Sequence, residues 1–188
     1  MRPFLRQTIE YIGELLRVIL ISLAIILPVR YFLIQPFYVK GASMEPNFYD
    51  HEYLIIDEIS YRFKEPARGD IVVFRYPSDP RQFFIKRVIG LPGETIQVKD
   101  GGVYLVNPKD DKLTFLSESY LSGVATPGER RLQLGLDEYA VLGDNRPSSM
   151  DSRHFGAVSR SLIVGRVWLR GWPLDRVGKF VTPAYSYN

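Results

Sequence analysis

The sequence contains no cysteine and only two histidines, His51 and His154, among its 188 residues. A chain without cysteine forms no disulfide and performs no thiol chemistry. Two histidines are too few for a zinc site with the usual ligands, so we expect no metal and no cofactor. The net charge is only +3, without a clustered basic stripe, which argues against nucleic-acid binding. A weak attraction to anionic lipid is a more economical use of this charge.

Long hydrophobic runs are also scarce, and only one region has the length of a membrane span. The composition, 46% hydrophobic and 24% charged, is that of a globular protein of one domain. Residues 15–34, LLRVILISLAIILPVRYFLI, carry charge only at Arg17 and Arg30, and a helix of about 20 residues reaches about 30 Å. The uncharged centre, residues 18–29, also suits a signal-peptide core or a buried helix. Because end arginines can snorkel and no small-residue cleavage site follows directly, we predict a retained transmembrane anchor over residues 15–34.

The orientation of this anchor follows from the basic residues beside it. They are more frequent before the uncharged centre (Arg2, Arg6 and Arg17) than just after it (Arg30 and Lys40). This is a weak positive-inside bias. We therefore expect residues 1–14 to be a short cytoplasmic segment and residues 35–188 to be an extracytoplasmic domain. The chain would be a single-pass protein of the cell membrane, and an internal membrane such as a thylakoid stays open.

After residue 36 the pattern changes to short alternating runs, rich in Val, Ile, Phe and Tyr, which are typical of strands. The candidates are EYLIIDEIS (52–60), GDIVVFRYP (69–77), QFFIKRVIG (82–90), ETIQVKDGGVYLV (94–106), EYAVLGD (138–144) and LIVGRVWLRGWP (162–173). Asp100-Gly101-Gly102 predicts a hairpin turn in the fourth run. Residues 107–136 mix Pro, Gly, Ser and charge, and we interpret them as an excursion from the main sheet. The prediction is a mostly β protein, with an antiparallel β-sheet domain behind one N-terminal helix.

Ser43, in the small and polar run KGASMEPNF directly after the predicted anchor, is a candidate nucleophile. A hydroxyl is a weak nucleophile at its own pKa and needs a positioned base. One candidate base is a histidine with an aspartate, for which the nearby pairs are His154 with Asp144 or Asp151, and His51 with Asp50. A second is a lysine made neutral by burial. In a third interpretation Ser43 is only a turn residue.

Lys86, in the run QFFIKRVIG, has a neighbourhood that is unusually apolar for a lysine. On a strand it shares a face with Phe84, whereas Phe83 and Ile85 point to the other face. A lysine that points into apolar surroundings is a credible neutral base. The pattern alone also fits a lysine that snorkels from an edge strand, so it leaves both interpretations open.

Four segments together indicate a family. GASMEPNF, RGDIVVFRYP, FIKRVIGLPGE and GDNRPSSMDSRHFG resemble, in order and character, the successive sequence boxes of type I signal peptidases. These are membrane-bound serine proteases that remove signal peptides from exported proteins. The resemblance implies an antiparallel β-sheet catalytic domain of the signal peptidase and SOS-repressor protease type. It also implies that Ser43 is the nucleophile and Lys86 its general base, acting through an acyl-enzyme, with signal peptides of preproteins and a lipid bilayer as partners.

The resemblance assigns supporting roles as well. Ser149 resembles the hydroxyl that orients the lysine ammonium, and Asp151 with Arg153 resembles an ion pair in the same wall of the site. Two positions depart from the family pattern. Asn47 stands where Thr is common, and Gly41 stands where some members carry a serine that joins the oxyanion hole. The oxyanion hole is therefore expected to rest chiefly on the Ser43 backbone N–H. Pro147 and Met150 also differ from frequent family residues.

Type I signal peptidases prefer small residues at the first and third positions before the cut, and the resemblance implies the same preference here. Apolar residues that flank the two reacting groups in the sequence are the candidates for the shallow pockets, namely Phe37, Val39, Met44, Phe84 and Ile85. By resemblance, the GDIVVF strand is expected to pair with an extended substrate.

Two other functions remain as alternatives. A self-cleaving protease of the SOS-repressor type shares the serine and lysine, but would need a DNA-binding module where this chain has an apolar helix. A membrane-anchored β domain that binds export substrates without cutting them is the other. The presence of Ser43, Lys86 and Ser149 together argues against that second alternative.

Overall fold

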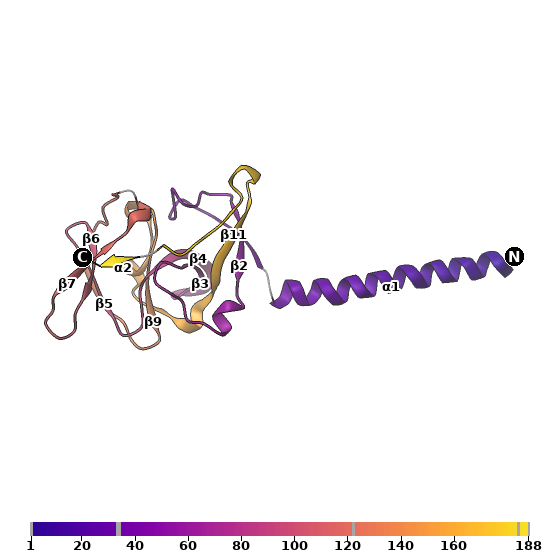
Figure 1. Cartoon of the computed structure of the whole chain (residues 1–188), viewed down its shortest axis with the longest axis horizontal. Helices are drawn as coiled ribbons and strands as arrows, with labels where there is room; N and C mark the ends of the chain where they lie inside the picture. Colours follow the sequence, from indigo (N-terminus) through magenta and orange to yellow (C-terminus); the bar gives the residue numbers. More distant parts are fainter. Residues whose placement is uncertain (1, 33–34, 122, 184, 188) are drawn as a thin grey trace.

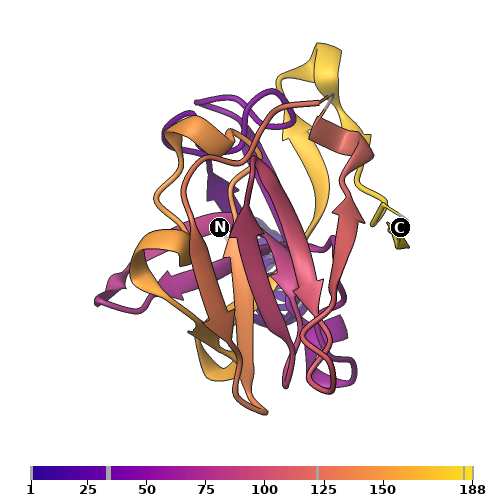
Figure 2. The same ribbon diagram turned by 90° about the vertical axis from the view of Figure 1, so that its left-hand side faces the viewer.

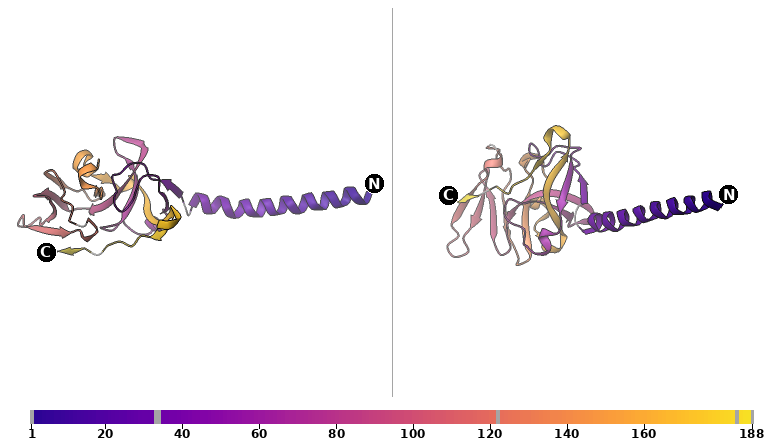
Figure 3. Two further views of the ribbon diagram at one scale, coloured as in Figure 1. Left: turned by 90° about the horizontal axis from the view of Figure 1, so that it is seen from above. Right: turned by 45° about the vertical axis from the view of Figure 1, so that its right-hand side comes forward.

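The structure is a computed structural model in which a long helix projects from a β-rich body (Figure 1). It describes residues 2–32, 35–121, 123–183 and 185–187. Helix α1 (Arg2–Phe32) forms no layer of the body, and the views in Figure 3 agree on this. The predicted anchor, residues 15–34, is therefore described only in part, because residues 33 and 34 lie outside the described residues.

Helix α1 is rich in exposed apolar side chains between residues 7 and 27, where every residue is exposed. Examples are Leu16, Leu20 and Ile26. Within the described part of the chain, no helix combines the length and apolarity needed to cross a membrane.

The main sheet carries eight antiparallel strands, and it confirms the predicted mostly β class. Its order is β1 (Gln35–Tyr38), β2 (Tyr53–Asp57), β11 (Ile163–Trp172), β3 (Ile71–Tyr76), β4 (Asp79–Gly90), β9 (Glu138–Leu142) and β10 (Val158–Ser159), with β12 (Gly178–Lys179) paired to β11. All six runs that the pattern singled out form strands of the two sheets. Sequence pattern did not predict the short strands β1, β10 and β12.

A second sheet of five strands faces the viewer in Figure 2. Its order is β13 (Ser186–Tyr187), β7 (Leu113–Ser117), β6 (Gly102–Val106), β5 (Thr95–Lys99) and β8 (Arg130–Gln133). The predicted hairpin joins β5 to β6, where Asp100 and Gly101 have φ values of 50° and 75°, as a tight two-residue turn requires. The segment 107–136 contains β7 and β8, so its strands belong to this second sheet.

The remaining described helices are short. They are α2 (Ser152–Phe155), η1 (Ser60–Arg62), η2 (Ser119–Leu121), η3 (Arg146–Ser148), η4 (Arg160–Leu162) and η5 (Leu174–Arg176). Helix η3 and helix α2 follow β9 closely, and Ser148 of η3 and Met150 between the two helices line the cavity described below.

Strand β4 matters most for the site because its two edges are used differently. One edge pairs with β3 between Phe83 and Arg87. On the other edge, among the described residues, pairing with β9 begins only at Arg87. The N-terminal half of β4 therefore keeps one open edge, and Lys86 lies at the point where the open edge ends.

Candidate active site

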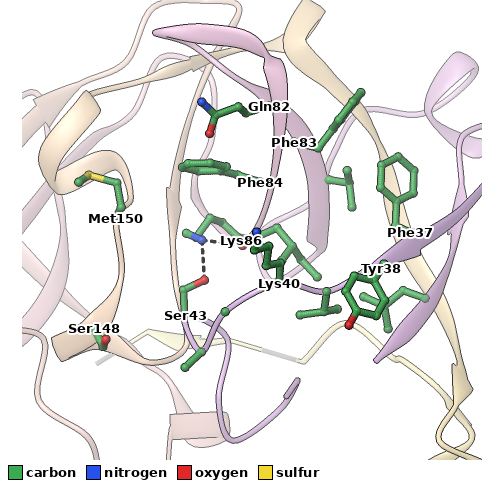
Figure 4. A pocket seen from close by; sticks show the side chains of 16 residues that line it. Phe37, Tyr38, Lys40, Ser43, Gln82, Phe83, Phe84, Lys86, Ser148 and Met150 are labelled. Atoms are coloured by element: carbon green, nitrogen blue, oxygen red, sulfur yellow. Dashed lines mark hydrogen bonds between the residues drawn. The ribbon is translucent and has the colours of Figure 1, made fainter. Parts of the chain in front are cut away.

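A cavity of about 430 Å³ lies between the open half of β4 and the loop that joins β1 to β2. Figure 4 shows Ser43 and Lys86 joined by a hydrogen bond among the lining residues, with Met150 to one side of them and Phe37 to the other. Most of the lining is apolar or aromatic. The lining residues are Phe37, Tyr38, Val39, Lys40, Gly41, Ala42, Ser43, Leu54, Val73, Gln82, Phe83, Phe84, Ile85, Lys86, Ser148 and Met150.

Lys86 is buried at the cavity floor, with only 4% of its surface exposed. Its Nζ lies 2.8 Å from Ser43 Oγ and 2.8 Å from the Ile85 carbonyl oxygen. The Phe84 ring centroid lies 5.3 Å from the same nitrogen. Burial lowers the pKa of the Lys86 amine to about 8, although the negative charges of Asp151 and Asp144 oppose the shift. A lysine in such surroundings has a substantial neutral fraction near pH 8.

Ser43 lies on the loop between β1 and β2, which we call the nucleophile loop, residues 39–52. Hydrogen bonds close this loop at its base, where Val39 N–H donates to the Glu52 carbonyl (2.8 Å) and His51 N–H donates to the Val39 carbonyl (3.1 Å). A single turn follows Ser43, since Phe48 N–H donates to the Met44 carbonyl (2.9 Å). The loop thus has a fixed shape without belonging to a sheet.

Distant residues hold the nucleophile loop beside β4. Asn145 donates twice, from Nδ2 to the Ala42 carbonyl and from its backbone N–H to the Ser43 carbonyl, both at 3.0 Å. Asn47, which departs from the family pattern, donates to Asp144 Oδ2 (2.8 Å). The same carboxylate accepts two hydrogen bonds from Arg87, next to Lys86.

Gly143 lets the segment after β9, which carries Asn145 and Ser149, approach Ser43. A Cβ atom at Gly143 would lie 2.1 Å from Ser149 Oγ and 2.5 Å from the Ser43 carbonyl oxygen. Real Cβ atoms do not approach other atoms so closely. Any larger residue at position 143 would therefore push Ser149 and the nucleophile loop away from the end of β9.

The predicted pair in this wall is formed: Arg153 Nη2 lies 2.8 Å from Asp151 Oδ2. Burial raises the pKa of the Asp151 carboxyl, but hydrogen bonds from Arg153 and from Gly143 N–H lower the pKa overall. Ser149 is buried beside them, but its Oγ has no hydrogen-bond partner among the described residues. Ser149 makes no hydrogen bond to Lys86 in this structure, and its role in orienting the lysine stays a prediction.

The predicted pocket residues separate into two groups. Phe37, Val39, Phe84 and Ile85 line the cavity. Met44 does not line the cavity, because its side chain is 1% exposed and packs in the core below the nucleophile loop. The expectation for GDIVVF is wrong, since β3 is paired with β11 on one edge and with β4 on the other.

Neither histidine lines the cavity. His154 is exposed on α2 and borders a separate hollow beside Arg130 and Arg153. His51 is exposed at the base of the nucleophile loop, where its Nδ1 contacts the Tyr38 hydroxyl and its Nε2 lies 3.4 Å from Asp50. Of the candidate bases, Lys86 is the one in contact with Ser43.

Sequence pattern missed several residues that shape the site. Phe83 and Tyr38 line the cavity, and Asn145 holds the nucleophile loop. No local signal could have linked Asn145 to Ala42, because 103 residues separate the two partners.

Comparison with known proteins matches this chain to one family. The family model described as signal peptidase, peptidase S26, matches residues 12–172. "Probable signal peptidase I-2" of Synechocystis sp. is 39% identical over 171 residues, covering 88% of this chain and 75% of the relative. "Signal peptidase I" of Leptolyngbya laminosa is 38% identical over 178 residues, covering 90% and 84%. A crystal structure of a signal peptidase I from Enterococcus faecalis is 34% identical, with a TM-score of 0.47, and covers 55% of this chain and 97% of that chain.

A mostly antiparallel β fold with a serine and a buried amine in contact defines a class of hydrolase built for acyl transfer. The matches are more specific than that class. The chain belongs to the signal peptidase family, peptidase S26, and the expected enzyme class, a serine endopeptidase of the signal peptidase I type, is confirmed.

Proposed function

We propose that this chain removes N-terminal signal peptides from exported preproteins, with Ser43 as nucleophile and Lys86 as general base. The observation that carries the mechanism is the 2.8 Å contact between Ser43 Oγ and the buried Lys86 Nζ at the floor of an apolar cavity. Family membership supports the choice of substrate. No metal or cofactor is needed for this chemistry.

In the first step, neutral Lys86 takes the Ser43 proton as Oγ bonds to the carbonyl carbon of the scissile peptide. The carbonyl π electrons move to oxygen and form an oxyanion. The Ser43 backbone N–H is the candidate donor to this oxyanion. Ser43 is half-buried, so a peptide can reach it from the cavity while Lys86 stays buried.

In the second step, the Lys86 ammonium gives its proton to the leaving amine as the C–N bond breaks, which leaves an acyl-enzyme on Ser43. A water molecule then attacks the ester carbonyl, and neutral Lys86 takes a proton from it. When the ester C–O bond breaks, the same proton returns to Ser43 Oγ and the signal peptide leaves as a carboxylic acid. Asp151 with Arg153 keeps the wall beside the lysine in place.

The open edge of β4 is the candidate surface for the extended substrate. Backbone groups near Phe83 and Ile85 on this edge have no strand partner among the described residues, so they can pair with a peptide.

Crowding of aromatic rings beside the cavity favours small substrate side chains near the cut. The Phe37 and Phe83 rings lie 5.5 Å apart, and Phe84 stacks on Tyr76 at 4.6 Å. Phe84→Ala should therefore increase cleavage of substrates with Val or Leu at the first or third position before the cut. An unchanged preference would remove Phe84 from the specificity pocket.

Helix α1 is the candidate membrane anchor, in line with the expected single-pass topology and an extracytoplasmic catalytic domain. Its exposed apolar side chains have no partner layer in the body of the protein. A bilayer would cover them, and Arg17 can reach the headgroup region from near the end of the apolar stretch. Retention of the purified protein in liposomes after a carbonate wash, compared with a variant that lacks residues 1–34, tests this assignment.

The decisive experiment is cleavage of a preprotein with an Ala-x-Ala site in detergent. We expect Ser43→Ala and Lys86→Ala to lose activity and His154→Ala to keep it. An inactive His154→Ala with an active Lys86→Ala would reject the lysine mechanism. If the native chain bound the preprotein without cutting it, the binding-module alternative would replace this proposal.

A further inference from the structure

The described residues after Trp172 form what we call the C-terminal strap, residues 173–183 and 185–187. It lies beyond residues 12–172, the part that the family model matches. The strap leaves β11, passes back across the body and ends as β13 beside β7 in the second sheet (Figures 1 and 3). We propose that Arg176 and Phe180 of this strap are positioning residues for Ser43, an inference that rests on the proposed function.

Arg176 supports the nucleophile loop through a buried charge. Glu52, which is 2% exposed, forms an ion pair with Arg176, whose Nη1 lies 2.7 Å from Oε1, and accepts a hydrogen bond from Arg170 Nη1 at 3.0 Å. Arg170 also donates to the Asn47 carbonyl at 3.0 Å. Since the Glu52 carbonyl closes the loop by accepting from Val39, the carboxylate and its two arginines hold both the base and the middle of the loop. A buried carboxylate that loses one partner is strongly destabilised where it stands.

Phe180 supports the same loop through a ring contact. Its ring centroid lies 4.4 Å from that of Phe48, and Phe48 is fully buried. Phe48 N–H donates to the carbonyl of Met44, the residue after the nucleophile. Phe180 therefore packs against the turn of chain that directly follows Ser43. Truncating it would open a cavity beneath that turn, which the turn can fill only by moving.

The far end of the strap is fixed as well, so it can act as a brace. Thr182 Oγ1 donates to Asp70 Oδ1 at 2.6 Å, and the Tyr185 and Tyr120 hydroxyls lie 2.8 Å apart. The strap passes so close to Gly69 that a Cβ there would lie 2.9 Å from the Tyr185 ring. Gly69 in turn accepts from Arg87, the neighbour of Lys86. The strap thus contacts the loop that carries Ser43 and, at Gly69, the segment bonded to the strand that carries Lys86.

The test compares Phe180→Ala and Arg176→Ala with Val181→Ala, whose side chain is 89% exposed on the same strap. With an Ala-x-Ala peptide well below each melting temperature, we expect kcat to fall at least ten-fold in the first two variants, because a small displacement of a nucleophile is costly. KM should stay within two-fold, and the midpoint of the pH profile should not move. Val181→Ala should match the native enzyme, and Phe180→Leu should restore most of kcat.

An unchanged kcat in folded Phe180→Ala, with only a lower melting temperature, would overturn the proposal and leave the strap a purely stabilising segment. An equal loss in Val181→Ala would overturn it too. If Phe180→Ala does not fold, Arg176→Ala decides: a ten-fold loss of kcat with an unchanged KM supports the proposal, and an unchanged kcat overturns it. Ser43→Ala in the same assay separates the two proposals, because its activity reports on the nucleophile alone.

Discussion

Ser43 and Lys86 touch each other, yet the two regions that carry them are built in different ways. Lys86 lies within β4, where the ladder with β3 on one side fixes its position and its direction. Ser43 lies in the nucleophile loop, which has no ladder and is held by side chains such as Asn145 from far along the chain. Lys86 is 4% exposed, whereas Ser43 is only half-buried.

This difference matches the roles that we propose for the two groups. A lysine becomes a base at moderate pH only when burial lowers its pKa, and burial requires a rigid and dry position. A nucleophile has to reach the substrate, so it is placed on an irregular segment at a cavity wall. Burying the lysine lowers the folding stability. The position of the serine instead depends on the many contacts that keep its loop in one shape.

Lys86→Met should show the largest effect on cleavage, and it should separate the loss of the base from the loss of stability that burial of the lysine causes. We expect cleavage to fall by a factor of about 1,000 or more, because the base is lost, while folding stability rises. The lowering of the Lys86 pKa to about 8 corresponds to about 3 kcal/mol against the folded state while the amine is charged.

The pH dependence of this gain in stability follows from the direction of the Lys86 pKa shift. The pKa of Lys86 is lower in the folded than in the unfolded state, so the unfolded state binds more protons between the two values and native stability rises with pH. The advantage of Lys86→Met should thus be full below pH 8 and disappear above about 10.5. Urea unfolding at several pH values measures it, with exposed Lys99→Met as the matched control. A Lys86→Met protein less stable than the native one at pH 7 would contradict the burial argument.

Asn145→Ala should show the next largest effect and probes the serine side of the comparison. It removes the hydrogen bond to the Ala42 carbonyl but keeps the backbone bond to Ser43. We expect kcat to fall by about five-fold to ten-fold, since one hydrogen bond contributes about 1 kcal/mol and the loop loses alignment. Asn107→Ala is the control, because it also removes a side-chain hydrogen bond, which Asn107 Oδ1 accepts from Lys109 N–H, and Asn107 does not line the cavity. Equal kcat values for the two variants would show that Asn145 does not hold the loop.

The same comparison explains what the sequence could predict. The apolar run around Lys86 predicted a strand, because strand period is a local property of QFFIKRVIG. The run left a buried lysine and a snorkelling lysine both open, and only the family resemblance favoured the buried one. The family, the mostly β class and the β5–β6 hairpin were also within reach. Met44 was misplaced, since alternation next to Ser43 does not tell the cavity from the core beneath it. The hold of Asn145 on Ala42 depends on two segments that meet only in the folded chain.

Asp151→Asn should have a smaller effect than Asn145→Ala, namely a shift in the pH profile of cleavage. Activity is expected to rise with pH through about 8, following the neutral fraction of Lys86. The Asp151 charge raises the pKa of Lys86, so its removal should lower that pKa and move the profile to lower pH by about 1 unit or less. The rate of acyl-enzyme formation as a function of pH measures this shift, with exposed Asp100→Asn as the control. A shift to higher pH would contradict the assigned electrostatics.

Asn47→Thr should have the smallest effect and tests whether the serine loop depends on the lysine strand. Asn47 Nδ2 donates to Asp144 Oδ2, and Asp144 keeps two hydrogen bonds from Arg87 when this donor is removed. Because Asn145 still holds Ala42 and Ser43, we expect stability to fall by about 1 kcal/mol in urea unfolding and kcat to stay within two-fold. A ten-fold loss of kcat would mean that the nucleophile loop takes its position from the Arg87–Asp144 pair. Serine and lysine would then be held by one connected unit, and the contrast between the two regions would disappear.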